Sequence, residues 1–259
     1  AIDTPPGGTI TAYGLDPDKL TDGEINRWKL DSVVPDHRVV IYHVSGHGAV
    51  ANSAVLTDAG IDRTTPDPLG GWFTRDSSGE PNGWCFDAAL SAIVPVAVEV
   101  GAHGPNFHTR GSRQELAAAV LRAQSAYLAA GLTTVCDAQV TSRELSTYAQ
   151  LHQRGQLRIR TVCMPLSHQI DEYLSVGMQT GFGDAKLHIG PMKFYADGSL
   201  SGGTAYFREP YEDGVHAHGG GHGHLLRPMH EIADDLIKVA AAGWRVGVHA
   251  IGDAAISEL

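Results

Sequence analysis

The chain has 259 residues, 42% of them hydrophobic and 19% charged, which is typical of a globular protein with a sizeable core. Its formal charge of -10, with no run among its 19 basic residues, argues against nucleic acid or an anionic membrane as a partner. We therefore expect a small-molecule ligand. Because the sequence shows no apolar run of membrane-spanning length and no signal-peptide pattern, we expect a cytoplasmic location and no membrane partner.

The first 100 residues predict an N-terminal segment with a strand and a loop-rich insertion. Residues 38–43 form a β-branched strand, and residues 49–56 have a helical composition that ends at Gly60. Glycine and proline are frequent over residues 62–83, so only loops and a short hairpin fit there. We interpret residues 1–100 as one part of the chain and residues 101–259 as the other.

The second part repeats one pattern: a helix, a capping glycine, a short apolar strand and a polar residue at the strand end. Helices are predicted over 112–130, 142–154, 171–178 and 229–242, and strands over 132–136, 157–164, 192–195 and 245–249. Such a repeat describes consecutive βα units of a parallel sheet, either a barrel or an open doubly wound sheet. No GxGxxG or GxxxxGK[ST] phosphate-binding motif follows any strand, so we favour the barrel.

Two of these strands carry chemically active residues, Lys193 and His249. A lysine inside an apolar strand is rarely buried without a partner, which favours a chemical role for Lys193 over a structural one. A single histidine at a strand end is more often a hydrogen-bonded core residue. On its own, the pattern around His249 therefore favours the structural interpretation.

Five phrases in the chain resemble successive signatures of the amidohydrolase superfamily branch called amidohydrolase family 3, which includes N-substituted formamide deformylases. They occupy residues 44–53 (VSGHGAVANS), 70–83 (GGWFTRDSSGEPNG), 131–138 (GLTTVCDA), 192–199 (MKFYADGS) and 248–255 (VHAIGDAA). The resemblance covers nearly all of residues 31–259, in the family's order. It implies a metal-dependent TIM barrel of the (β/α)8 type that hydrolyses amide-like C–N bonds, for example in N-formyl or N-acyl amides, by a metal-activated water.

The resemblance also implies roles for individual residues. Lys193 matches a catalytic, metal-binding lysine of the fourth barrel strand that becomes carboxylated by carbon dioxide, and His249 matches a metal-binding histidine of the fifth strand. The metal is expected to be zinc or another divalent ion, in a site with one or two ions. His47 and Asp197 are expected near the substrate, although a turn-stabilising role for His47 and a helix-capping role for Asp197 remain as alternatives.

Several family features have no counterpart in this chain. The His-x-His pair of the first strand, a histidine of the sixth and an aspartate of the eighth are missing, so we expect an internal piece with about strands 2–5. His216, His218, His222 and His224 have the His-x-His spacing, but they lie in a glycine-rich loop that no apolar strand enters, and we reject them as the missing pair.

Two functions therefore stay open at this stage. The chain is either part of an active metal-dependent amidohydrolase, or a catalytically inactive fragment of that fold that acts as a binding or association module. A partial barrel also leaves strand edges unpaired, so we expect self-association or a homo-oligomer.

Overall fold

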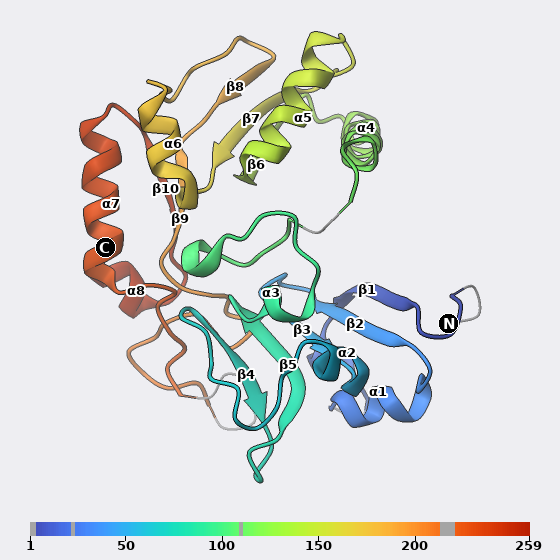
Figure 1. Cartoon of the computed structure of the whole chain (residues 1–259). Coiled ribbons are helices and arrows are strands. Elements are labelled where there is room, and N and C mark those ends of the chain that lie inside the picture. The colour runs from blue at the N-terminus through green and yellow to red at the C-terminus, as the bar shows by residue number, and fades with distance from the viewer. Residues whose placement is uncertain (1–3, 22–23, 109–110, 213–220) are drawn as a thin grey trace. The chain divides into compact units, whose positions relative to one another are not determined.

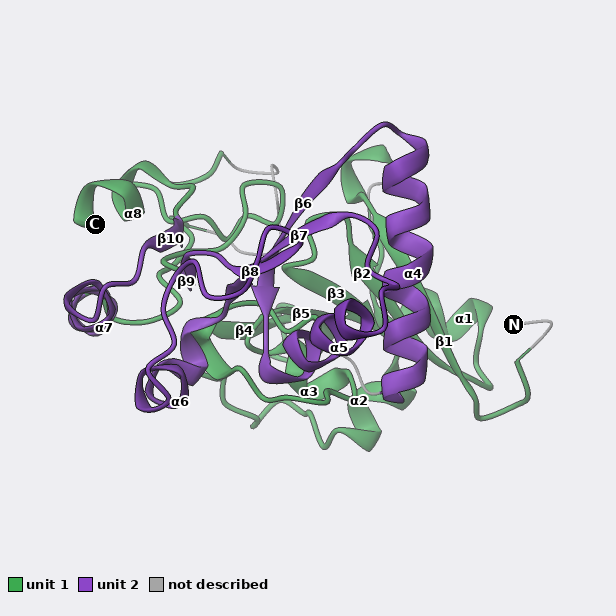
Figure 2. Ribbon diagram, turned by 90° about the horizontal axis from the view of Figure 1, so that it is seen from above, with its two compact units in different colours: residues 1–109, 195–229, 250–259 green, residues 110–194, 230–249 purple. Residues whose placement is uncertain are grey.

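The chain contains both helices and strands in the computed structural model, which describes residues 4–21, 24–108, 111–212 and 221–259 (Figure 1). By packing, the chain divides into two units (Figure 2). Unit 1 comprises residues 1–109, 195–229 and 250–259, and unit 2 comprises residues 110–194 and 230–249. The division into residues 1–100 and 101–259 that the sequence indicates remains a prediction.

Unit 1 is built on a five-stranded sheet with the order β1-β2-β3-β5-β4. β1 pairs with β2 in parallel, and the remaining neighbours are antiparallel. The strands are β1 (Thr9–Leu15), β2 (Arg38–His43), β3 (Gly48–Ala51), β4 (Gly71–Arg75) and β5 (Pro81–Asp87). The helices are α1 (Arg27–Val33), α2 (Ser53–Asp58), α3 (Leu90–Ile93) and α8 (Asp253–Glu258), with 3-10 turns at Pro17–Lys19 and Gly101–His103.

One prediction in unit 1 is wrong in its first half. The helix expected over residues 49–56 is strand β3 up to Ala51, and helix α2 begins only at Ser53. All four residues of β3 are buried, because Ala49 and Ala51 pack into one core cluster and Val50 packs into another. A strand buried on both faces shows no alternation, so its composition resembles that of a helix. Asn52 separates the two elements, because its side-chain oxygen accepts hydrogen bonds from the backbone N–H groups of Val39 and Val55.

Unit 2 follows the alternation that the sequence predicts except at β8, a short strand over Leu187–Ile189 that was not predicted. β6, β7 and β8 form a parallel sheet, and β9 pairs with β10. An isolated parallel bridge between Leu166 and Lys193 connects the end of β7 with β9. The strands are β6 (Thr134–Val140), β7 (Arg160–Pro165), β8 (Leu187–Ile189), β9 (Met192–Tyr195) and β10 (Val246–His249). The helices are α4 (Arg113–Ala129), α5 (Ser142–Gln153), α6 (Ile170–Ser175) and α7 (Met229–Ala241), with a 3-10 turn at Ser167–Gln169.

The glycines after α4 and α5 end these helices as predicted. Gly131 and Gly155 have φ angles of 82° and 66°, in the left-handed region that favours glycine. The core of unit 2 lies between the strands and the inner faces of the helices, and Leu151, Met192 and Phe194 are among its most buried side chains.

The α/β class is therefore confirmed, but the barrel is not. Within the described residues, the sheets are small and none of them closes on itself. Nor does any described helix combine the length and the apolar surface that a bilayer crossing requires.

Candidate functional site

Lys193 lies in β9 between two core residues. The side chains of Met192 and Phe194 are buried in the core of unit 2, and strand alternation turns Lys193 to the other face, where it is half-buried. Burial lowers the pKa of Lys193, because water stabilises the charged ammonium more than the neutral amine and burial removes that water. The nearby Cys136 opposes this shift. The neutral form of Lys193 is therefore more populated than that of a lysine on an exposed surface.

His249 is the last residue of β10, the strand next to β9, and it is half-buried. The backbone N–H of Met192 donates a hydrogen bond of 2.9 Å to the carbonyl of Arg245, which fixes the start of the pairing. The structure therefore brings the two predicted metal-binding residues onto adjacent strands of one unit.

Strand β6, which pairs with β7, carries Cys136 and Asp137, and Cys136 interacts electrostatically with Lys193. Asp137 accepts a hydrogen bond of 2.8 Å from the hydroxyl of Tyr148 on α5. The pKa of Cys136 is raised by burial and by Asp137, and Lys193 counteracts this rise. Across the part of the chain that the structure describes, no three His, Cys, Asp or Glu side chains lie together in a way that could hold a metal ion.

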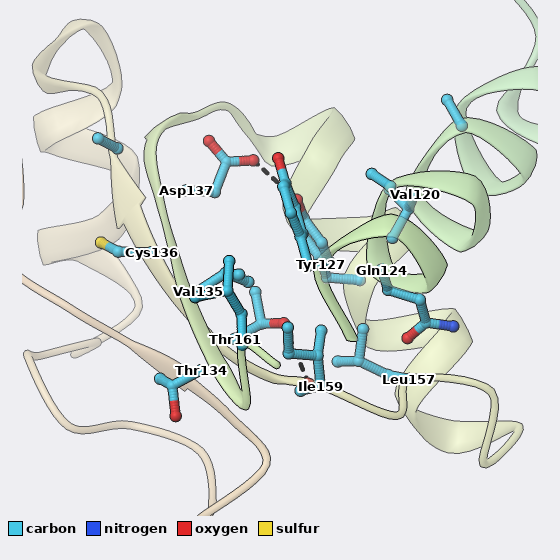
Figure 3. A pocket seen from close by; sticks show the side chains of 15 residues that line it. Val120, Gln124, Tyr127, Thr134, Val135, Cys136, Asp137, Leu157, Ile159 and Thr161 are labelled. Carbon is cyan, nitrogen blue, oxygen red and sulfur yellow. Dashed lines mark hydrogen bonds between the residues drawn. The ribbon is translucent and has the colours of Figure 1, made fainter. Parts of the chain in front are cut away.

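A pocket of about 640 Å³ lies beside β6, with α4 and the start of β7 around it (Figure 3). Tyr127 and Val120 of α4 and Asp137 of β6 are among its lining residues, and the dashed line at Asp137 is the hydrogen bond from Tyr148. Neither Lys193 nor His249 lines this pocket. It is therefore a separate feature of unit 2, mostly apolar in its lining.

In unit 1, His47 forms a buried pair with Asp87. The distance from His47 Nδ1 to Asp87 Oδ1 is 2.6 Å, and the Asp87 side chain is completely buried. His224 lies on the other side of the same carboxylate, with Nε2 3.6 Å from Oδ2. The ring of His224 also packs edge-on against Trp72, at a centroid distance of 4.4 Å. The structure thus surrounds one carboxylate with two histidines from distant segments.

Sequence reasoning missed Asp87 and assigned no role to His224. Asp87 follows the apolar run Trp84-Cys85-Phe86, and this position at a strand end was the local signal that could have identified it. Of the other histidines in the glycine-rich loop, His222 donates to the carbonyl of Phe207 at 3.1 Å, whereas His216 and His218 lie outside the described residues.

Asp197 is also completely buried, and its carboxylate binds the backbone. It accepts hydrogen bonds from the N–H groups of Tyr206 (2.9 Å), Ile251 (3.0 Å) and Gly252 (2.8 Å). A side chain at position 252 would collide with the carbonyl of Tyr206, so only glycine fits there. Asp197 therefore joins the loop after β9 to the segment before α8. The substrate contact expected of it remains a prediction.

A family model described as the amidohydrolase family matches residues 1–259. The putative amidohydrolase YtcJ of Bacillus subtilis (strain 168) is 31% identical over 253 residues, covering 94% of this chain and 42% of that protein. The N-substituted formamide deformylase of Arthrobacter pascens is 27% identical over 242 residues, covering 89% of this chain and 41% of that protein.

Among solved structures, the chain is similar to an uncharacterized metal-dependent hydrolase from Pyrococcus horikoshii OT3. The two share 26% sequence identity with a TM-score of 0.63, over 97% of this chain and 46% of the other. This chain thus spans less than half the length of these relatives.

Proposed function

Because the chain belongs to the amidohydrolase family, we propose that it is part of a metal-dependent hydrolase that cleaves amide-like C–N bonds, such as those of N-formyl or N-acyl amides. The observation that carries this proposal is the placement of Lys193 and His249 on adjacent strands, β9 and β10, of one unit. The deformylase and metal-dependent hydrolase among its relatives support the same class of reaction.

We also propose that β6, β7, β9 and β10 correspond to about strands 2–5 of a (β/α)8 barrel. The parallel pairing of β6 with β7 and the parallel bridge from Leu166 to Lys193 support this arrangement. Parallel strands in such folds direct their carboxyl ends to one edge of the sheet, which is where ligands bind.

The side chains present fit a metal site only in part. The neutral imidazole of His249 is a suitable ligand for zinc or a similar divalent ion, but a lysine ammonium repels a cation. Carboxylation removes that conflict: the neutral Nζ of Lys193 attacks the carbon of carbon dioxide and a C–N bond forms. One C=O π bond opens to place the negative charge on oxygen, and an N–H bond breaks as its proton leaves to solvent. The lowered pKa of Lys193 increases the share of the neutral amine that can react.

Two donors do not complete a site, and we propose that further ligands come from segments outside this chain. When bound there, one or two divalent ions would supply a Lewis acid that polarises the amide carbonyl and activates water. Lys193 and His249 would hold the metal from one side, and His47 would contact the substrate. The alternative is a catalytically inactive fragment that serves association, which the absence of a three-donor group among the described residues favours.

The test measures zinc by anomalous scattering at its absorption edge, together with turnover of N-formyl and N-acyl amides. It compares this chain with a version that carries its flanking segments. We expect metal and turnover in the longer version, and a loss of at least about 100-fold in turnover for Lys193→Met and His249→Ala. Lys186, which is half-buried like Lys193, and the exposed His230 of the same unit supply the controls, Lys186→Met and His230→Ala.

Retention of metal and turnover in Lys193→Met and His249→Ala would contradict the assigned roles. Stoichiometric metal and full turnover in this chain alone would contradict the claim that further ligands lie outside it. Absence of both from the longer version would favour the association module.

A further inference from the structure

The carboxylate of Asp197 connects the two chain segments that follow β9 and β10. β9 ends at Tyr195 and β10 ends at His249. Oδ1 of Asp197 accepts a hydrogen bond of 3.0 Å from the N–H of Ile251, and Oδ2 accepts one of 2.8 Å from the N–H of Gly252. One side chain after β9 therefore receives two successive backbone N–H groups after β10. We refer to the connected segments, residues 196–206 and 250–252, as the clasp.

A turn within the clasp returns the chain to the same carboxylate. The N–H of Ser199 donates a hydrogen bond of 2.6 Å to the hydroxyl of Thr204, whose own N–H donates to the carbonyl of Ser199 at 3.0 Å. The N–H of Tyr206 then donates to Oδ2 of Asp197 at 2.9 Å. A Cβ atom built on Gly252 would lie 1.8 Å from the carbonyl oxygen of Tyr206, so the two segments are in direct backbone contact.

Burial makes these hydrogen bonds hard to replace. The side chain of Asp197 is completely buried, so solvent water does not compete for its oxygens. Hydrogen bonds from N–H groups to an ionised carboxylate are shorter and stronger than those between neutral groups. A carboxylate that lost such donors in the interior would carry a large desolvation cost. The clasp is therefore fixed by directional contacts to the backbone, which define position more sharply than apolar packing does.

The clasp begins shortly after the two residues that we propose as metal ligands. Lys193 precedes Asp197 by four residues, and His249 precedes Ile251 by two. Because an extended residue spans about 3.3 Å, little chain separates the clasp from either side chain. Groups that share a metal ion need to be held within about 0.5 Å of their productive positions. β9 and β10 have four residues each, so a displacement at their ends would also move Lys193 and His249.

We propose that Asp197 is a positioning residue: its carboxylate fixes the end of β10 against the end of β9, and thereby holds Lys193 and His249 in the relative position that a shared metal ion requires. This inference rests on the proposed function, in which both side chains bind metal. In this role Asp197 acts through the backbone of the clasp, without contact to the metal.

The first test needs neither metal nor activity. Amide hydrogen exchange of this chain, followed by NMR, measures how readily each backbone hydrogen bond opens. We expect Asp197→Asn to accelerate exchange in β9 and β10 by at least about 10-fold, including the N–H of Met192, which donates to the carbonyl of Arg245. The N–H of Thr161 donates to the carbonyl of Lys186 in the same unit, and its exchange should change by less than about 2-fold.

Asp31→Asn is the matched control, because Asp31 also accepts a backbone N–H and a hydroxyl within unit 1, both from Ser53. This substitution should leave exchange in β9 and β10 unchanged. Equal acceleration at Met192 and Thr161 would indicate a general loss of stability and would overturn the proposal. Equal effects of Asp31→Asn and Asp197→Asn on β9 and β10 would also overturn it.

The wild type supplies a readout that does not depend on the folding of any variant. The amides of Ile251 and Gly252 should exchange at least about 100-fold more slowly than those of an unstructured peptide, because a buried carboxylate holds them. Rapid exchange of both amides in the wild type would overturn the proposal even if Asp197→Asn does not fold.

The second test is a titration of the longer version with Co²⁺, which accepts the same donors as zinc and absorbs visible light. We expect Asp197→Asn to weaken Co²⁺ binding by about 10- to 100-fold and to alter the visible spectrum, which depends on ligand geometry, whereas Asp31→Asn should change neither. An unchanged affinity and spectrum in Asp197→Asn would refute positioning of the ligands. If the wild type binds no Co²⁺, the proposed function fails, whereas hydrogen exchange still decides whether the clasp holds β9 and β10 together.

Discussion

Asp87 and Asp197 are two fully buried carboxylates in unit 1 that bind different partners. Asp87 faces the imidazole rings of His47 and His224, whereas Asp197 receives three backbone N–H groups. Hydrogen bonds to a charged acceptor contribute about 1.5–3 kcal/mol each, so the main measurable role of Asp197 is structural.

Replacement of Asp197 by asparagine tests that role. The amide keeps one acceptor oxygen and points N–H donors at a backbone N–H, so we expect the free energy of unfolding to fall by about 2–3 kcal/mol. Urea unfolding followed by circular dichroism measures the change. Asp76 is a matched control because it also accepts backbone N–H groups, but in a solvent-accessible hairpin turn. A loss for Asp76→Asn as large as that for Asp197→Asn would contradict this explanation.

His224 makes the stability of unit 1 depend on pH. Burial lowers the pKa of His224 below its ordinary value of 6.5, while the charges of Asp87 and Asp197 oppose the shift and His47 adds to it slightly. Just below pH 6.5, His224 is therefore protonated in a larger fraction of unfolded chains than of folded chains. Stability should fall as the pH is lowered from 7 to 5.

We expect His224→Gln to show a smaller fall over the same range, because glutamine does not titrate. Urea midpoints at pH 7, 6 and 5 give the comparison. The control is His222→Gln, since His222 is exposed in the same loop and binds a backbone carbonyl. Equal slopes for wild type and His224→Gln would argue against this assignment.

At the scale of elements, α4 shows how local signals define a helix. Its N-terminus carries a capping box, in which Ser112 accepts from the N–H of Glu115 and Glu115 accepts from the N–H of Ser112. Its C-terminus is closed by Gly131. Such signals lie within a few residues of each other, so the sequence could predict the bounds of this helix to within a residue.

Loss of the cap should weaken the helix measurably. We expect Ser112→Ala to lower the free energy of unfolding by about 1 kcal/mol, because the first turn loses an acceptor for its N–H groups. Ser125→Ala on the exposed face of the same helix should change it by no more than about 0.5 kcal/mol. Equal effects of the two substitutions in urea unfolding would rule out the capping contribution.

At the scale of the whole molecule, β6 lies at the end of its sheet, and β7 is its one strand neighbour within the residues that the structure describes. Thr134, Cys136 and Ala138 of this strand are exposed. An edge with free N–H and C=O groups is a template for pairing with another chain. We therefore propose that this chain self-associates through β6, in line with the homo-oligomer expected from the sequence.

Sedimentation velocity tests this proposal. The chain should sediment as a dimer or a larger species, and Ala138→Lys should shift it towards monomer, because a lysine at an edge strand opposes pairing. Ala126→Lys, on the exposed face of α4, adds the same charge away from the edge and should leave association unchanged. A monomer at all concentrations would disprove the proposal.

The sequence by itself determined the helices and strands after residue 110 apart from β8 and α8, and the positions of Lys193 and His249 at strands β9 and β10. Both depend on periodicity and capping, which are local properties. It predicted the first half of 49–56 wrongly, because the burial of β3 on both faces is set by the two core clusters against which it packs, whose members come from distant segments.

Only the tertiary structure brought His47, Asp87 and His224 together and gave Asp197 its three backbone partners. Each of these contacts joins segments that are distant in the chain. A hydrogen bond between such segments requires no particular spacing or composition near either residue, so no local pattern records it. The residues with local signals could therefore be predicted, whereas the pairing of His47 with Asp87 was visible only in the folded chain.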